Sequence, residues 1–190
     1  MLVEFVGYAA DCIVTGQLEV HGTRVSDAID GSAVLTLQNA TLTSLLDGRQ
    51  VHEPELVLDR DELLAVRTGG PGGEVARRIR TVRHRLRAEM GPYVVLGQLH
   101  VKPGASALRS LSARRKIVPL TDATILVPTE RGVEASQTPV ILINVSHIDA
   151  VSLVGTDDSP WELRTADQVL GREMLQPLQD RPLGVPLHRR

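Results

Sequence analysis

Two stretches of the chain read almost alike, Gly16-Gln17-Leu18-Glu19-Val20 and Gly97-Gln98-Leu99-His100-Val101. A second pair follows them in the same order, Leu37-Gln38-Asn39-Ala40 in the first half and Leu120-Thr121-Asp122-Ala123 in the second. Self-similarity at a nearly fixed spacing is the signature of a repeated structural unit. The sequence therefore predicts a tandem duplication.

A third shared segment, residues 56–66 against residues 141–151, carries the duplication to the end of each copy. The spacing between copies grows slightly along the chain, as loop insertions between fixed strands would produce. We expect a first repeat over residues 1–68 and a second over residues 82–154. Units of this size have marginal cores, so the copies are expected to pack on each other or on another subunit.

Each copy alternates short aliphatic and β-branched runs with turn formers, which is typical of β-strands. Six strands are expected per copy, at residues 3–6, 12–20, 34–37, 41–46, 56–58 and 63–66, and at 84–87, 93–101, 117–120, 124–127, 140–145 and 148–153. A helical turn or shaped loop is expected over residues 24–30 and 108–114. Strands this short at regular spacing indicate a mainly β fold, a small barrel or a sandwich.

The segment between the copies, residues 69–81, is predicted to be a linker. It opens with Gly69-Gly70-Pro71-Gly72-Gly73, whose glycines bend easily and whose proline cannot donate to a sheet. A phosphate-cradling loop is the functional alternative, but no lysine followed by serine or threonine comes after it. Residues 74–90 fit both helical and strand spacing, and the duplication favours a strand from about His84.

After Val154 the strand pattern stops, and residues 155–190 are predicted to form a short helix and an extended tail. Ser159-Pro160-Trp161-Glu162 offers an N-cap, a proline at the first helical position and a glutamate at the third. Trp161 is a candidate anchor for partner docking, with packing on its own domain as the alternative.

Composition places few constraints on partners. The net charge is −2, and the chain has one Trp, two Tyr and one Phe, too few for binding single strands by base stacking. The one cysteine, Cys12, excludes an intrachain disulfide and lies in an apolar strand, which favours a buried structural thiol. The first residues lack signal-peptide features and no apolar run is long enough to span a bilayer, so we expect a cytoplasmic protein with no membrane association.

No catalytic residue, metal ligand or cofactor site is predicted. The six histidines lack close metal-ligand spacing, and no Gly-x-Ser-x-Gly elbow occurs. The carboxylates that cluster in the first copy do not recur in the second, and they suit turns and caps; these are Asp27, Asp30, Asp59, Asp61 and Glu62. The chain is therefore not expected to be an enzyme.

One basic stretch stands out. The candidate phosphate or nucleic-acid contacts are Arg77, Arg78, Arg80, Arg83, Arg85 and Arg87, joined by Arg114, Arg115 and Lys116. Arginine forks match phosphate geometry, and each neutralised phosphate adds salt-dependent affinity. The alternative is a solvated face, or ion pairs with acidic residues of the first copy.

Each copy carries a Gly-x-Leu element, at Gly16-Gln17-Leu18 and Gly97-Gln98-Leu99, and then a Leu-x-Asp-Ala strand, matched by Leu120–Ala123 and approached by Leu37–Ala40. This order of features resembles the Sm-like small β-barrel of the Sm, LSm and Hfq proteins. The resemblance implies two tandem Sm-like barrels in one chain.

The chain departs from that family at the turn between the last two strands. Asp59-Arg60 and Asn144-Val145 stand where the family has Arg-Gly, so its RNA-binding residues are not carried over. Arg24–Asp30 is similar to a turn of an uncharacterised bacterial domain family without known activity. A PilZ-type cyclic-dinucleotide barrel is a weaker resemblance, based on the spacing of Arg83 and Arg87.

The function expected from these observations is that of a non-catalytic scaffold or adaptor that acts through protein contacts and self-association. Small β units leave open strand edges, and burying an edge against another copy satisfies its backbone groups. A homo-oligomer with unidentified protein partners is therefore expected. The alternative is RNA or cyclic-dinucleotide binding through residues 77–87.

Overall fold

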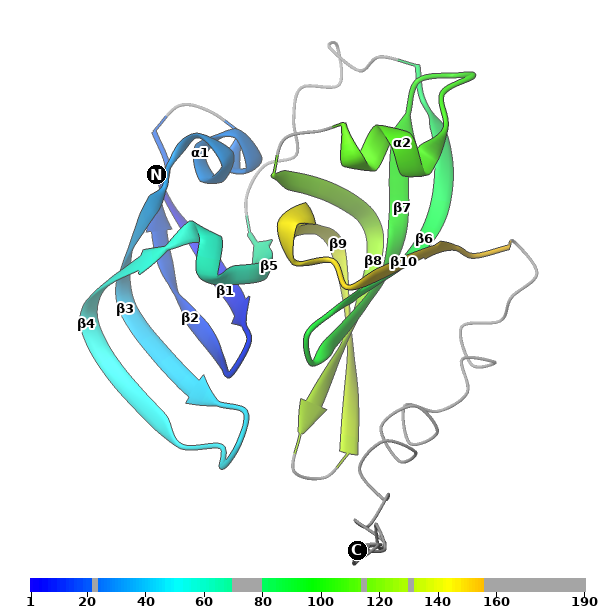
Figure 1. Ribbon diagram of the computed structural model, residues 1–190. Coiled ribbons are helices and arrows are strands. Elements are labelled where there is room, and N and C mark those ends of the chain that lie inside the picture. Colours follow the sequence, from blue (N-terminus) through cyan, green and yellow to red (C-terminus); the bar gives the residue numbers. More distant parts are fainter. Residues whose placement is uncertain (22–23, 70–79, 114–115, 130–131, 156–190) are drawn as a thin grey trace, which may run out of the picture. The chain divides into compact units, whose positions relative to one another are not determined.

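The computed structural model describes residues 1–21, 24–69, 80–113, 116–129 and 132–155. These residues form one open, ten-stranded antiparallel sheet and two short helices (Figure 1). The prediction of a mainly β fold is confirmed. Within the described ranges the strands join into a single sheet, and neither half closes into a separate barrel.

The strands of the first half are β1 (Leu2–Ala9), β2 (Cys12–Glu19), β3 (Val34–Ser44), β4 (Gln50–Asp59) and β5 (Leu63–Thr68). Those of the second half are β6 (Val82–Met90), β7 (Tyr93–Val101), β8 (Ile117–Thr129), β9 (Gly132–Asn144) and β10 (Ala150–Leu153). Short 3-10 turns, η1 (Arg60–Glu62) and η3 (Val145–His147), precede β5 and β10.

The strand order repeats between the halves. The first half runs β5-β1-β2-β3-β4 and the second runs β10-β6-β7-β8-β9, with β5 paired to β9 where the halves meet. Every strand of one half thus has a counterpart at the same place in the other. The two outermost strands of the whole sheet are β4 and β10.

The repeated Gly-x-Leu element marks a bulge at which two strands approach closely. The β2–β3 register shifts at Gly16, and the β7–β8 register shifts at Gly97. A Cβ atom at Gly16 would lie 3.1 Å from the Gln38 carbonyl oxygen, and one at Gly97 would lie 2.9 Å from the Leu120 Cβ. Only glycine allows this approach, which explains why the element recurs.

The repeated Leu-x-Asn/Asp-Ala element supplies the other side of the same bulge. Asn39 has a φ of 49° and Asp122 a φ of 47°, and these two residue types tolerate the left-handed region best after glycine. The prolines Pro54 and Pro139 lie opposite them, where the β3–β4 and β8–β9 pairing skips one residue pair. Proline has no N–H to donate, so it fits at a position where the ladder skips a residue pair.

The predicted number of strands in each half, and the predicted starts of two strands, are wrong. Residues 34–37 and 41–46 are not separate strands, because the bulge at Asn39 bends β3 without ending it, and β8 is continuous for the same reason. Each half therefore has five strands rather than six. The strands β4 and β9 also begin earlier than expected, because the exposed polar residues before Leu56 and Ile141 carry no alternating apolar signal.

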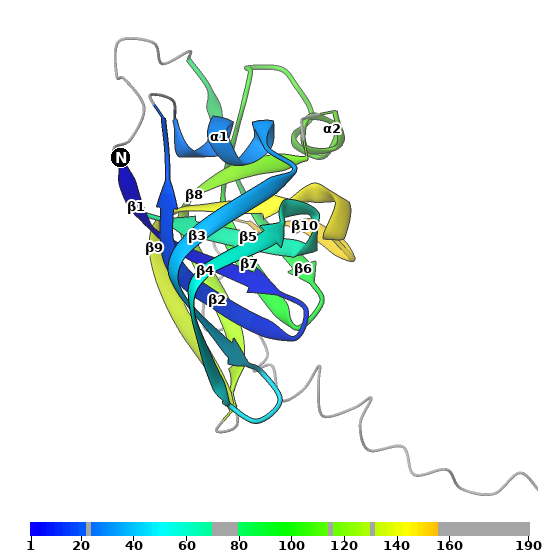
Figure 2. The same ribbon diagram turned by 90° about the vertical axis from the view of Figure 1, so that its left-hand side faces the viewer.

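Both helices occupy the predicted position between the second and third strands of their half. They are α1 (Val25–Gly31), which buries Val25 and Ile29, and α2 (Ala107–Ser112), which buries Ala107 and Leu111. The four-residue spacing puts each pair on one helical face. Both helices lie toward the same end of the sheet (Figure 1 and Figure 2).

Several predictions fall on residues outside the described ranges. They are residues 70–79 of the predicted linker, the C-terminal helix and tail with Trp161, and the basic residues Arg77, Arg78, Arg114 and Arg115.

We predict that Asp122→Ala lowers the free energy of unfolding by about 1 kcal/mol, because alanine has no side chain suited to a positive φ. Asp122→Gly should lower it less, since glycine adopts this conformation without steric cost. Urea unfolding followed by circular dichroism measures both. Equal losses for the two variants would show that backbone conformation is not what this position requires.

Candidate interaction site

The halves of the sheet meet at a short joint between β5 and β9. Ala65 pairs with Ile143 and Val66 pairs with Leu142. Next to these pairs, the buried side chain of Asn144 donates from Nδ2 to the Leu63 carbonyl oxygen at 3.1 Å. Only two residue pairs continue the sheet here, so side chains must supply the rest of the contact.

Polar contacts surround this joint. The Lys116 Nζ atom lies 2.7 Å from Asp61 Oδ2, and His147 Nε2 donates to the Asp61 carbonyl oxygen at 2.6 Å. The Lys116 and Arg60 side chains hold the pKa of Asp61 below its ordinary value. Because Asp61 is exposed, solvent screens this ion pair, and its main effect is to orient η1 against the second half.

Apolar contacts at the joint are shared by both cores. Leu142 and Ile117 of the second half belong to the core cluster of the first half. In return, Tyr8 and Leu64 of the first half belong to the core cluster of the second. Each half is therefore completed by side chains of the other.

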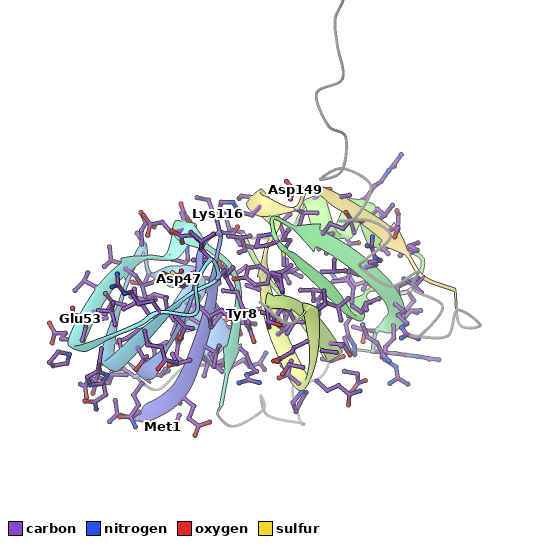
Figure 3. The ribbon with its side chains drawn as sticks, turned by 90° about the horizontal axis from the view of Figure 1, so that it is seen from below. Met1, Tyr8, Asp47, Glu53, Lys116 and Asp149 are labelled. Atoms are coloured by element: carbon purple, nitrogen blue, oxygen red, sulfur yellow. The ribbon has the colours of Figure 1, made fainter. Side chains whose placement is uncertain are left out.

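Tyr8 and Tyr93 mark the centre of this shared region. Their rings meet edge to face with centroids 5.4 Å apart, and the Tyr93 hydroxyl donates to the Ala9 carbonyl oxygen at 2.8 Å. Burial raises the pKa of the Tyr93 phenol, so it stays protonated and available as a donor. Figure 3 places Tyr8 between the strands of the two halves.

The residues that correspond to the joint residues lie at the outer edges of the sheet. The β4 residue Val57 corresponds to Leu142, and the β3 residue Val34 corresponds to Ile117. Leu142 and Ile117 are 3% and 7% exposed, whereas Val57 and Val34 are 60% and 51% exposed. Positions that are buried at the internal joint are thus open to solvent at the free edge.

The other free edge is more polar. Where the first half has Tyr8 and Leu64, the second half has Glu89 and Asp149. Glu89 forms an ion pair with Arg87, and Asp149 accepts a hydrogen bond from the Gly91 N–H at 2.7 Å.

The two edges differ in charge. The β4 edge presents exposed carboxylates at Glu53, Glu55 and Asp59, and Figure 3 shows Glu53 on the outer side of the sheet. At the opposite end, β6 lies next to β10 and carries Arg83, Arg85 and Arg87 on alternate positions. Alternate residues of a strand share one face, so these arginines form a basic row.

The structure separates the predicted basic residues. Arg83, Arg85 and Arg87 lie on β6, and Arg80 precedes that strand, whereas Lys116 lies at the internal joint against Asp61. The alternative of ion pairs with acids of the first copy is confirmed for Lys116, which pairs with Asp61. The arginines of β6 lie far from Glu53, Glu55 and Asp59, because β4 and β6 belong to opposite ends of the sheet.

The residues that hold the joint were not found by sequence reasoning. Asn144, Tyr93 and Lys116 contact the first half, but their sequence context shows no pattern that names a partner. The sequence does show that the two copies differ at two of these positions. Asn144 corresponds to Asp59, and Tyr93 corresponds to Cys12.

Among the described residues no group of three or more His, Cys, Asp or Glu side chains is arranged to hold a metal ion. Burial, together with the nearby carboxylates of Asp11 and Glu62, raises the pKa of the Cys12 thiol to about 11. A thiol protonated at neutral pH is a poor nucleophile. No helix in the described ranges is long and apolar enough to cross a membrane.

Comparison of the chain with protein-family models, with curated proteins and with solved structures finds no match.

We predict that Asn144→Asp destabilises the fold by about 2 kcal/mol or more, because a carboxylate cannot donate to the Leu63 carbonyl and would be buried next to it. The matched control is Asp59→Asn at the corresponding exposed position, which should change the free energy of unfolding by less than about 0.5 kcal/mol. Urea unfolding compares the two. Similar effects of both substitutions would contradict the role given to Asn144.

Proposed function

We propose that the protein is a non-catalytic scaffold whose copies associate head to tail, the β4 edge of one copy pairing with the β10 edge of the next. In this arrangement the contact between copies repeats the β5–β9 joint inside each chain. A contact between two different surfaces produces a closed ring, or a filament if the rotation does not close. Other protein partners would then bind to the assembled surface.

We further propose that each half is a member of the Sm-like class of small barrels, opened so that its last two strands pair with neighbours. The glycine at the bulge and the Leu-x-Asn/Asp-Ala strand opposite it support this relation, because they build the same bend in both halves.

The observation that carries the proposal is the exposure of Val57 and Val34. Their counterparts Leu142 and Ile117 complete a neighbouring core, whereas these two valines belong to neither core cluster of the described residues. Burying apolar area of this kind yields about 25 cal/mol for each Å² removed from water. A second copy offers the same strand plan at β10, with Glu89 and Asp149 where the internal joint has Tyr8 and Leu64.

Backbone geometry also supports the contact. The internal joint uses only Ala65 and Val66 of β5, and their counterparts Ala150 and Val151 both lie within the four-residue strand β10. The four-residue strand β10 is therefore long enough to form the two residue pairs that such a joint needs. Unpaired strand edges are templates for pairing with another chain.

Charge selects the orientation. The acidic β4 edge of one copy would approach the basic row of β6, which is the neighbour of β10, in the next copy. Two β4 edges would instead bring like charges together. Complementary potentials favour the first arrangement and disfavour the second.

We predict that the wild-type protein has the mass of two or more chains in light scattering, and that Val57→Glu and Ala150→Glu each have the mass of one. A charge buried without a partner at either edge costs about 3–5 kcal/mol. Leu46→Glu, on the 90% exposed tip of a turn, is the matched control and should keep the wild-type mass.

Mixing the two edge variants tests the head-to-tail geometry. Each retains one intact edge of the opposite kind, so the equimolar mixture should form a complex of two chains. Circular dichroism shows first that both variants are folded. A wild-type monomer at high concentration, or variants that do not combine, would refute the proposal.

Nucleic-acid or cyclic-dinucleotide binding is a second candidate, favoured by the row of arginines on β6. Side chains on alternate strand positions are regularly spaced along one face, as successive phosphates are along a backbone. Arg87 is already paired with Glu89, which leaves Arg83 and Arg85 as the main candidates.

This candidate predicts that binding of labelled RNA or of a cyclic dinucleotide weakens steeply with added salt and is lost in Arg83→Glu/Arg85→Glu. The control is Arg24→Glu/Arg49→Glu, which makes the same change of charge on the first half. Fluorescence anisotropy measures both. Binding that is absent, or equally reduced by the two double variants, would eliminate this function.

A further inference from the structure

An open cavity of about 780 Å³ lies between the strands of the first half and the η3 region of the second half. Its walls include the apolar side chains of Val14 on β2, Leu42 on β3 and Leu56 on β4. The turn after β1, residues 9–11, and the η3 region of the second half, residues 146–149, also line it. Cavities of this size fall in the range of small-molecule sites.

The second half shows what fills the corresponding space. Cys12 lines the cavity, and its counterpart is Tyr93, whose fully buried ring packs in the core cluster of the second half and against Tyr8 of the first half. Ala9 also lines the cavity, and its counterpart is Met90, which is fully buried as well. At two places the first half thus has a small residue where the second has a large one.

Three of the apolar walls are alike in the two halves. Val14, Leu42 and Leu56 correspond to Val95, Ile125 and Ile141, all of which are apolar and buried. Next to these walls, the small side chains of Cys12 and Ala9 leave space that the larger Tyr93 and Met90 side chains fill in the second half. The cavity is open at the surface, so a ligand that covers its apolar walls would remove them from water.

The charges at the cavity are of one sign. Asp11, Glu62 and Asp149 line it, and no lysine or arginine is among its described lining residues. The same negative environment contributes to the raised pKa of Cys12. His147 adds a ring whose Nε2 already donates to the Asp61 carbonyl oxygen. An anionic ligand would be repelled here, whereas a neutral or positively charged one would not.

We propose that this cavity binds a small aromatic molecule that is uncharged or carries a positive charge. Its ring would take the place that the Tyr93 ring takes in the second half, against the same kind of aliphatic walls. A positively charged group would lie toward the carboxylates. Tyr93 supports the choice of an aromatic ring, because its position in the second half is the one that Cys12 leaves open.

The test uses the full chain and two probes of the same shape. Tyramine carries a phenol ring and an ammonium group, and 3-(4-hydroxyphenyl)propionate carries the same ring with a carboxylate. We expect tyramine to shift backbone amide signals of residues 9–14 and 146–149 in NMR titrations, and to bind at least about tenfold more tightly than the anion, as opposite charges near carboxylates require. Absence of tyramine binding, or preference for the anion, would overturn the proposal.

Substitutions that fill the cavity provide a second test of the ligand site. Cys12→Tyr introduces the residue of the second half and should weaken tyramine binding at least about tenfold, because the ring occupies the space. Ala9→Met should act in the same direction and serves if Cys12→Tyr does not fold. Cys12→Ser leaves the volume nearly unchanged and should bind as the wild type does. Tyramine binding unaffected by a folded filling variant would place the ligand elsewhere and refute the site.

The Cys12 thiol gives an independent readout. Bound tyramine should slow the alkylation of Cys12 by iodoacetamide, measured near pH 9 where some thiolate is present, while the anionic probe should not. Unchanged rates would contradict the proposal. If the signals of residues 9–14 respond to protein concentration and not to tyramine, a second copy fills the cavity and the small-molecule assignment is wrong.

Discussion

The β5–β9 joint is the contact on which the rest of this structure depends. It continues the sheet across the duplication with only two residue pairs, and it exchanges core side chains in both directions. Units of about 70 residues have too little interior to be very stable alone, so a shared core solves the problem that their size creates. The buried Asn144 side chain donates a hydrogen bond to the Leu63 carbonyl oxygen at this joint. The corresponding residue of the first half is Asp59, whose ionised carboxylate could not donate such a bond.

The repeated strand order also explains why the sheet has two unlike free edges among the described residues. The internal joint pairs β5 with β9, and these two strands are the counterparts of β10 and β4. The counterparts do not pair with each other in the described structure, so β4 and β10 form the two outer edges of the sheet. The copies have since diverged at the joint residues and in the interior. The second half has the buried Asn144 and Tyr93, whereas the first half has Asp59 and Cys12 at these positions and carries the exposed β4 edge and the open cavity.

Much of the fold could be predicted from the sequence, because its repeated elements report local geometry. The strand at Tyr93–Val101 has the predicted bounds, and the elements around Gly97 and Asp122 mark one bulge. The joining of two units into one sheet could not be predicted, since strand pairing depends on contacts between distant residues that no local pattern encodes. For the same reason the basic residues formed one group in sequence and two in space, with Lys116 at the joint.

The most direct test of this account is to produce residues 1–69 and 80–156 as separate chains and to record their proton–nitrogen correlation spectra alone and mixed. If each half needs the other's side chains to complete its core, each fragment alone should show the narrow amide dispersion of an unfolded chain. The mixture should then recover the dispersed spectrum of the intact protein. A well-dispersed spectrum and cooperative unfolding for either fragment alone would contradict the central claim.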